Sequence, residues 1–331
     1  MQSDYRAIGL VPRPFVTHTY TPNYNSRLVR TGPQGFRAQY TYEGTIIDLR
    51  MLRSRYSRCR LMLGGSTAFG IGASSDRMTM AALLGQPDLP CVNLGVSGAG
   101  TQHELAYYLS LRHLLPEVSD IILFSGFNEC VHARLPEAAV YQQFGGTVLG
   151  PQRCEPPPPG RLRRMARRVL SYQRGVTDNA AAPAAEDKSP AAGAIDSRLK
   201  ITLDRAIRNL EIWRALEDAF GFRVHFVLQP VMGWTVKEWT EAEQANWEAD
   251  QRKLGAMGTW MTSATLYEHT RDKFELGAAQ AGIRFYDANE WLATGYADTT
   301  VFADICHFHD SGQRAMAGEL DKNLDWTLSK C

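Results

Sequence analysis

The sequence predicts an α/β fold, a three-layer α/β/α sandwich built on a doubly wound, five-stranded parallel sheet. Short apolar runs alternate with segments of helical periodicity along the 331 residues, which is the order expected of βαβ units. The run Asp120–Ser125 (DIILFS) is almost continuously apolar, as in strands buried on both faces of a parallel sheet. The apolar run at Leu61 ends in Gly64-Gly65-Ser66. A serine in that place lies at the carboxyl edge of the sheet, where open α/β sheets bind their ligands.

The individual elements follow from the spacing of apolar residues. Apolar side chains recur at helical intervals in Leu199–Phe220, whereas RVHFVL has the length and β-branched content of a strand. The predicted strands are Arg60–Leu63, Pro90–Leu94, Asp120–Ser125, Arg223–Leu228 and Ile283–Tyr286. The predicted helices between them are Met78–Leu84, Gln102–Leu115, Leu199–Phe220 and Thr265–Gln280.

Two regions depart from this alternation. Residues 1–58 are rich in aromatic and turn residues and alternate in FRAQYTY, so we expect a β-rich extension packed on the main domain of 59–331. Residues 150–198 are rich in Pro, Ala and Arg, which predicts a flexible insertion. Within it, the six arginines of Arg161–Arg174 have two interpretations. They form a solvated basic face, or they belong to a lid or dock for an anionic partner such as an acyl carrier protein.

Composition excludes several classes of protein. The formal net charge is +1, which argues against a nucleic-acid binder that relies on bulk electrostatics. No apolar window is long enough to span a bilayer, and the amino terminus has no signal-peptide pattern. The six cysteines have no paired spacing, so free thiols in a reducing, cytoplasmic setting are expected. Oligomeric state has no readable signal.

Four blocks in the chain carry residue types suited to acyl-group chemistry. They are Leu61–Gly72 (LMLGGSTAFGIG), Asn93–Glu104 (NLGVSGAGTQHE), Leu123–Glu129 (LFSGFNE) and Asp304–Asp310 (DICHFHD). Their order resembles that of the SGNH (GDSL-like) hydrolase superfamily, whose flavodoxin-like fold agrees with the predicted sheet. Two departures are visible, because Gly65 stands where an acidic residue is usual and Glu129 where aspartate is common. Asn25–Arg37, which ends in a Gly-Phe-Arg element, also resembles a leader found before the serine block in some intracellular members.

The resemblance implies a serine-dependent site. Ser66 is the nucleophile, His307 its general base, and Asp304 the group that orients the imidazole. The backbone N–H groups of Ser66 and Gly98 and the side-chain amide of Asn128 would form the oxyanion hole. Candidate substrate-lining residues are Thr67, Glu129, Gln229 and Trp234.

Other interpretations of the same residues remain open. Ser66 is also placed to cap the following helix, and Gly98 and Asn128 are residues that turns use. His309 is two residues from His307, so an extended backbone would point it the other way. An Asp304/His307/His309 metal site lacks further ligands elsewhere in the sequence, and no metal or organic cofactor is expected.

These patterns favour hydrolysis of a carboxylic ester or thioester of a small molecule through an acyl-Ser66 intermediate. One alternative is an acyltransferase or thioesterase in a biosynthetic pathway of secondary metabolism, with the same site and a different acceptor. A second is a non-catalytic SGNH-like binding protein. Nothing in the sequence separates hydrolysis from transfer, because water exclusion depends on pocket shape.

Overall fold

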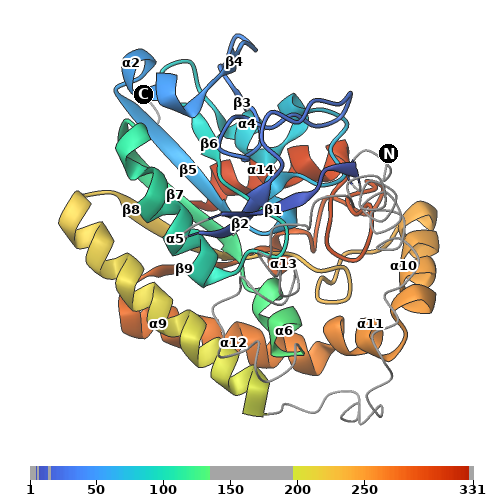
Figure 1. Ribbon diagram of the computed structural model, residues 1–331. Coiled ribbons are helices and arrows are strands. Elements are labelled where there is room, and N and C mark those ends of the chain that lie inside the picture. Colours follow the sequence, from blue (N-terminus) through green and yellow to red (C-terminus); the bar gives the residue numbers. More distant parts are fainter. Residues whose placement is uncertain (1–4, 6, 14–15, 135–196, 328–331) are drawn as a thin grey trace, which may run out of the picture.

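The predicted parallel sheet is confirmed in the computed structural model, which describes residues 5, 7–13, 16–134 and 197–327. Five parallel strands pair in the order β6-β5-β7-β8-β9 (Figure 1). They are β5 (Arg58–Gly64), β6 (Cys91–Asn93), β7 (Glu117–Ser125), β8 (Arg223–Leu228) and β9 (Arg284–Asp287). Each lies within three residues of its predicted bounds. The order is that of doubly wound flavodoxin-like sheets, whose ligand crevice opens beside the first strand, here between β5 and β7.

Alternation along the strands separates two layers of core. Leu61 and Leu63 of β5 belong to one apolar cluster, and Met62 between them belongs to the other. Phe226 and Val227 of β8 divide in the same way. This period of two is what a strand covered on both faces requires, and it explains why the apolar runs in the sequence are continuous.

Helices cover both faces of the sheet and form the outer layers (Figure 1). On one side α5 (Thr101–Leu111), α9 (Ser197–Phe220) and α12 (Ala264–Ala281) pack against each other or against the strands. On the other side α4 (Met80–Leu84) packs against α14 (Asp310–Asn323). The remaining described helical segments are α2 (Leu49–Arg55), α3 (Ser66–Phe69), η1 (Asp76–Met78), η2 (Arg112–Leu114), α6 (Phe127–Ala133), α10 (Glu241–Leu254), α11 (Ala256–Met261) and α13 (Ala288–Trp291).

The tryptophan-rich segment contains two helices that sequence periodicity did not predict, α10 and α11. Helix α10 is polar on most of its surface and only Glu243 is buried, so it lacks the apolar stripe by which a helix is usually recognised. A capping box defines its start, since Thr240 accepts from the Glu243 N–H and the Glu243 carboxylate accepts from the Thr240 N–H. The Thr-x-x-Glu pattern is the sequence feature from which the start of this helix could have been predicted.

The N-terminal residues form two antiparallel hairpins, β1 (Leu10–Arg13) with β2 (Thr17–Tyr20) and β3 (Gln39–Tyr40) with β4 (Ile46–Ile47). Their side chains do not form a core of their own. Tyr20, Val29 and Phe36 lie in the same apolar cluster as Leu61. The hairpins therefore share buried surface with the α5 side of the sheet.

Arg37, the last residue of the Gly-Phe-Arg element, joins this region to the strand end that carries Ser66. Its side chain is only 1% exposed, and its Nε donates to the Asp76 carboxylate at 2.8 Å. Nη1 donates to the carbonyl oxygens of Phe69 and Gly70 at 3.1 and 2.9 Å, which are the last residue and the C-cap of α3. Nη2 donates to the Leu28 carbonyl at 2.9 Å. The guanidinium thus satisfies the carbonyls that a four-residue helix leaves open.

Replacing Arg37 with methionine is expected to destabilise the protein by about 3–5 kcal/mol, because Asp76 and the three carbonyls would lose their buried donor. Urea denaturation measures the change. Arg58→Met is the matched control, since Arg58 pairs with Glu117 at 2.7 Å on the surface, where both side chains are at least 40% exposed. That change is expected to cost about 0–1 kcal/mol, and equal losses in the two variants would contradict the role given to Arg37.

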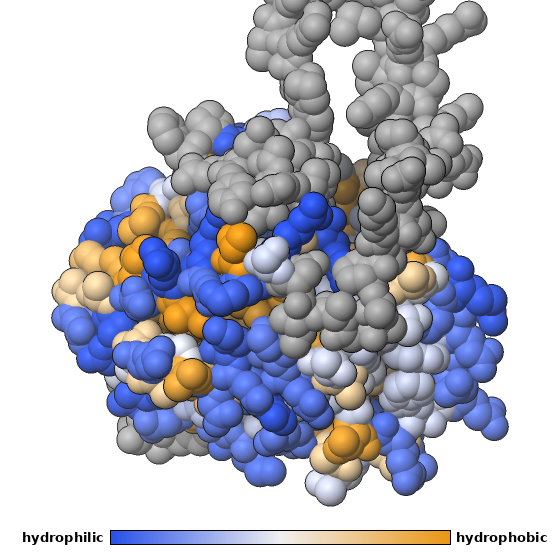
Figure 2. Space-filling model, turned by 90° about the horizontal axis from the view of Figure 1, so that it is seen from below, coloured by the Kyte–Doolittle hydropathy of each residue, from blue (hydrophilic) through white to orange (hydrophobic). Residues whose placement is uncertain are grey.

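The face seen from below is mostly hydrophilic, with apolar residues in small groups (Figure 2). Within the described residues, no helix combines the length and apolarity required to cross a membrane. Residues 135–196, including Arg161–Arg174, lie outside the described residues, and the last two residues of the predicted 150–198 insertion are the first two of α9.

Candidate active site

Ser66 stands at the carboxyl end of β5, as the first residue of α3. The turn before it needs glycine for two reasons. Gly64 has a φ of +149°, and a Cβ built there would lie 2.2 Å from the Phe124 carbonyl oxygen of the neighbouring strand. Gly65 is closely approached by the Asn128 amide, 2.3 Å from a built Cβ. A side chain at Gly65, including the acidic one usual in the resembled family, would force Asn128 to move.

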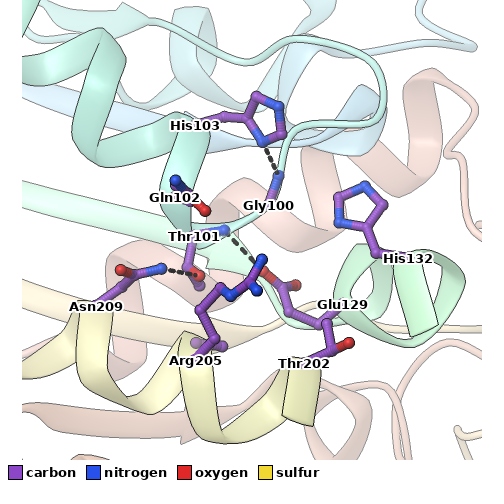
Figure 3. Close-up of a pocket in the computed structure, with 10 residues that line it drawn as sticks. Gly100, Thr101, Gln102, His103, Glu129, His132, Thr202, Arg205 and Asn209 are labelled. Atoms are coloured by element: carbon purple, nitrogen blue, oxygen red, sulfur yellow. Dashed lines mark hydrogen bonds between the residues drawn. The ribbon is translucent and has the colours of Figure 1, made fainter. Parts of the chain in front are cut away.

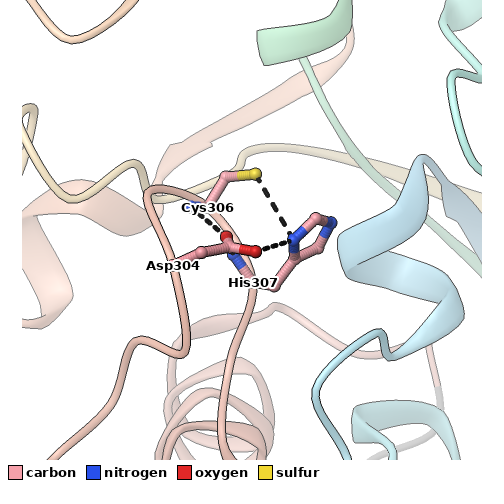
Figure 4. A group of neighbouring side chains, drawn as sticks. All are labelled: Asp304, Cys306 and His307. Atoms are coloured by element: carbon pink, nitrogen blue, oxygen red, sulfur yellow. Dashed lines mark hydrogen bonds and ion pairs between the residues drawn. The ribbon is translucent and has the colours of Figure 1, made fainter. Parts of the chain in front are cut away.

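Three predicted side chains meet here, one from the end of β5 and two from the Asp304–His307 turn near the end of the sequence. His307 Nε2 lies 2.7 Å from Ser66 Oγ, and His307 Nδ1 lies 2.7 Å from Asp304 Oδ2. The other carboxylate oxygen, Asp304 Oδ1, accepts the N–H groups of Cys306 and His307 at 3.0 and 2.9 Å. Figure 4 shows Asp304 and His307 facing each other across the turn that joins them. This arrangement orients one imidazole nitrogen to a carboxylate and the other to a hydroxyl.

The charges of the Asp304–His307 pair stabilise each other. Burial favours a higher pKa for Asp304, but the imidazole and the two backbone donors outweigh it and hold that pKa well below its ordinary value. Burial favours a lower pKa for His307, but the Asp304 carboxylate outweighs it and leaves that pKa well above 6.5. The site therefore favours an imidazolium beside a carboxylate, which is the state formed when a base takes a proton from serine.

The three predicted oxyanion donors follow the carboxyl ends of β5, β6 and β7 along the chain. Gly98 is exposed, with a φ of +73°. Within the described part of the chain, neither its N–H nor that of Ser66 has an acceptor. The Asn128 amide donates one hydrogen to the Ala99 carbonyl at 2.6 Å, and its second hydrogen is not used in that contact.

The four residues predicted to line the substrate site are all buried, at 1–3% exposure. Thr67 Oγ1 donates to the Cys306 carbonyl at 3.1 Å and accepts from Gln229 at 3.2 Å, so both residues support the loop that carries His307. Trp234 stacks on Tyr267, and Glu129 accepts from the Thr101 N–H at 2.7 Å. These four side chains therefore pack against other parts of the protein in this structure.

A cavity of about 400 Å³ opens beside His307. Sequence reasoning missed most of the residues that line it, because they come from other elements that dock against the Asp304–His307 turn. Asn246, Asp250 and Lys253 project from one face of α10, and Tyr5 comes from the N-terminal region. His309, which the sequence ranked below His307, also lines this cavity. The Thr-x-x-Glu signal would have identified α10 but not its docking position.

Asp304, Cys306 and His307 form the one group of three possible metal ligands found within the described residues, with donor atoms within 4.8 Å (Figure 4). Their donors already have partners. Both Asp304 oxygens accept hydrogen bonds, and Nδ1, the ring nitrogen facing Cys306 Sγ at 3.9 Å, is held by Asp304. Burial raises the pKa of the Cys306 thiol, which keeps it protonated. The group is therefore satisfied as a hydrogen-bonded turn.

A smaller cavity of about 20 Å³ lies at the start of α5 and is lined partly by Gly100, Glu129 and His132 (Figure 3). It is about the size of one water molecule. Glu104, on α5, is completely buried nearby, and Glu129 and the Ser125 hydroxyl lie close to its carboxyl group. Burial, with a smaller effect of Glu129, raises the pKa of Glu104 to about 8. The carboxyl is therefore neutral at neutral pH.

Glu104→Gln is expected to make the protein more resistant to urea at high pH. The folded protein holds the Glu104 proton up to about pH 8, whereas the unfolded chain releases it near its ordinary pKa of about 4.3. Wild-type stability is therefore greatest at low pH and is lost as pH rises through that window, on the order of a few kcal/mol. The Glu104→Gln variant has no ionisable group at this position, so its stability should not fall with pH in this way.

The measurement is urea denaturation of both proteins at pH 5, 7 and 9. The exposed Glu211 of α9 provides the control Glu211→Gln. A variant whose stability relative to wild type does not rise between pH 5 and pH 9 would contradict the neutral, buried state of Glu104.

Several solved structures are similar to this chain over about four fifths of its length. A member of the lipolytic G-D-S-L family from Veillonella parvula has 11% sequence identity and a TM-score of 0.41, covering 81% of this chain and 98% of its own. The acetyl xylan esterase AlAXEase has 11% identity and a TM-score of 0.43, with 80% and 99% covered. TesA has 13% identity and a TM-score of 0.42, with 82% and 99% covered. No protein-family model and no curated protein matches the sequence.

Proposed function

We propose that the protein is a serine hydrolase of the SGNH type that cleaves a carboxylic ester or thioester of a small molecule. The observation that carries this proposal is the chain of two 2.7 Å contacts from Asp304 through His307 to Ser66 Oγ. Such a relay converts a weak hydroxyl nucleophile into a reactive one. Its position at the crevice between β5 and β7 supports the same conclusion.

In the proposed reaction, Ser66 Oγ attacks the acyl carbon while its proton passes to His307 Nε2. The negative oxygen of the tetrahedral intermediate is stabilised by the N–H groups of Ser66 and Gly98 and by the Asn128 amide. The alcohol or thiol then leaves with the proton from His307, and Ser66 carries the acyl group. Water, deprotonated by His307, releases the acid and restores the serine.

Transfer is the second candidate, and the cavity beside His307 favours it. An alcohol, amine or thiol bound among Asn246, Asp250 and Lys253 would lie next to the base that must deprotonate it. The same acyl-Ser66 intermediate would then pass its acyl group to that acceptor. Product analysis with candidate acceptors present distinguishes ester formation from release of free acid.

The test is covalent labelling with a fluorophosphonate, in which Ser66 Oγ bonds to phosphorus and fluoride leaves. The expected result is a mass increment on the peptide that contains Ser66. A panel of esters and thioesters of graded chain length identifies the acyl group. Folded protein that neither labels at Ser66 nor turns over any ester would overturn the proposal in favour of a binding protein on this scaffold.

A further inference from the structure

We infer that His18 and His132 are positioning residues that fix the orientation of the Gly98 N–H. The inference rests on the proposed function, because it assigns them a role in the oxyanion hole. Both histidines bond to the carbonyls of a three-residue stretch, Ser97–Ala99, which we call the oxyanion loop. His18 belongs to the N-terminal hairpin and His132 to α6, so neither is a sequence neighbour of the loop.

The contact of His18 fixes the peptide that carries the proposed donor. His18 Nε2 lies 3.0 Å from the Ser97 carbonyl oxygen. Ser97 C=O and Gly98 N–H belong to one trans peptide plane, in which the two groups point in opposite directions. Holding the carbonyl toward His18 therefore holds the Gly98 N–H away from His18. The peptide cannot rotate to hide the N–H without breaking this bond.

The surroundings of His18 identify its donor nitrogen. Nδ1 lies 3.1 Å from Thr17 Oγ1, which can donate to it, and this leaves Nε2 as the protonated nitrogen that donates to Ser97. The ring is 3% exposed, and burial lowers its pKa, so it stays neutral at pH 7. Tyr107 Oη donates to the His18 carbonyl at 2.8 Å and anchors the backbone. Thr17 has a φ of +67°, an uncommon value for a β-branched residue.

His132 and Asn128 continue the same pattern along the loop. His132 Nε2 lies 2.9 Å from the Gly98 carbonyl, and the Asn128 amide donates to the Ala99 carbonyl at 2.6 Å. Three consecutive carbonyls are thus each held by a side chain from another element. Tyr20 adds a fourth contact, from its hydroxyl to Ser97 Oγ at 2.6 Å. A loop with a glycine at φ +73° has ready alternatives, and these contacts select one of them.

Burial also keeps the second histidine uncharged at neutral pH. It lowers the pKa of His132 to about 4. Both rings therefore remain neutral through the pH range in which His307 works as a base. The N-terminal hairpin, part of the predicted β-rich extension, is the element that delivers His18 and Tyr20 to the loop.

The test compares His18→Leu with His18→Gln, whose side-chain amide can reproduce the Nε2 donor, and repeats the pair at His132. The leucine variants are expected to lower kcat for a short p-nitrophenyl ester about 10- to 100-fold, below the cost of losing an oxyanion donor outright. KM should change less than about threefold, because ground-state binding does not use the loop. Glutamine should restore most of the rate. His113→Leu, at an exposed histidine, is the matched control.

Two further readouts separate positioning from general damage. The preference for an ester over its thionoester should fall in the leucine variants, because sulfur accepts hydrogen bonds poorly and gains little from an intact hole. Hydrogen exchange of the Ala99 amide, which donates to the Val96 carbonyl at 3.0 Å, should rise about tenfold and needs no activity. Leucine variants with unchanged kcat and unchanged exchange would overturn the inference. Faster exchange in a protein that never labels at Ser66 would overturn the proposed function alone.

Discussion

Ser66→Ala is expected to reduce kcat/KM for short p-nitrophenyl esters by about 10⁴- to 10⁶-fold, and fluorophosphonate labelling should disappear. The alanine lacks the oxygen that forms the acyl bond, while the proposed oxyanion donors and the cavity beside His307 remain. His307→Ala should give a loss of the same order, because the serine and the histidine act as a unit. For the same reason, the double variant should be no less active than either single variant.

Folding is not expected to limit this comparison, since Ser66 is only partly buried and its described side-chain partner is His307. Circular dichroism and urea denaturation verify this for each variant. Ser57→Ala, at an exposed serine just before β5, is the control and should keep wild-type activity. Turnover within tenfold of wild type in Ser66→Ala would eliminate the acyl-serine mechanism.

Asp304→Asn is expected to lower kcat by about 10³- to 10⁴-fold and to change the pH profile. The His307 base must be neutral to accept the serine proton. Because Asp304 holds the His307 pKa well above 6.5, wild-type kcat/KM should rise with pH through a value above 6.5. Asparagine removes the negative charge, so the rising limb of the residual activity should move to lower pH.

The matched control is Asp250→Asn, which removes a carboxylate from the same cavity, keeps an oxygen that can accept from the Ile305 N–H of the loop, and leaves the bond to His307 Nδ1 in place. Its effect on kcat should be less than about tenfold, with little displacement of the rising limb. If the rising limb of the pH profile lay at the same pH in Asp304→Asn as in the wild type, Asp304 would not be the group that raises the pKa of His307.

The strands were predictable because each is buried on both faces and leaves a continuous apolar run in the sequence. Arg223–Leu228 was predicted with its observed bounds, and the other four strands within three residues. Helices with an apolar stripe, such as α9 and α12, were predictable for the same reason. Helix α10 was not, because it buries little apolar surface.

The sequence by itself determined which residue types follow each strand, and therefore that a serine, a glycine and an asparagine lie at one edge of the sheet. This works because parallel strands place all their carboxyl ends together. The sequence did not determine which way the neighbouring side chains point. Thr67, Glu129, Gln229 and Trp234 are buried among internal partners, although their positions suggested substrate contact.

Only the tertiary structure decided what surrounds the candidate site. The contacts of His18 with Ser97, of Arg37 with α3 and of Asp250 with the loop bearing His307 join residues 32 to 79 positions apart. Hydrogen bonds of this kind leave no periodic pattern in a sequence, because they depend on how elements dock and not on the burial of a face.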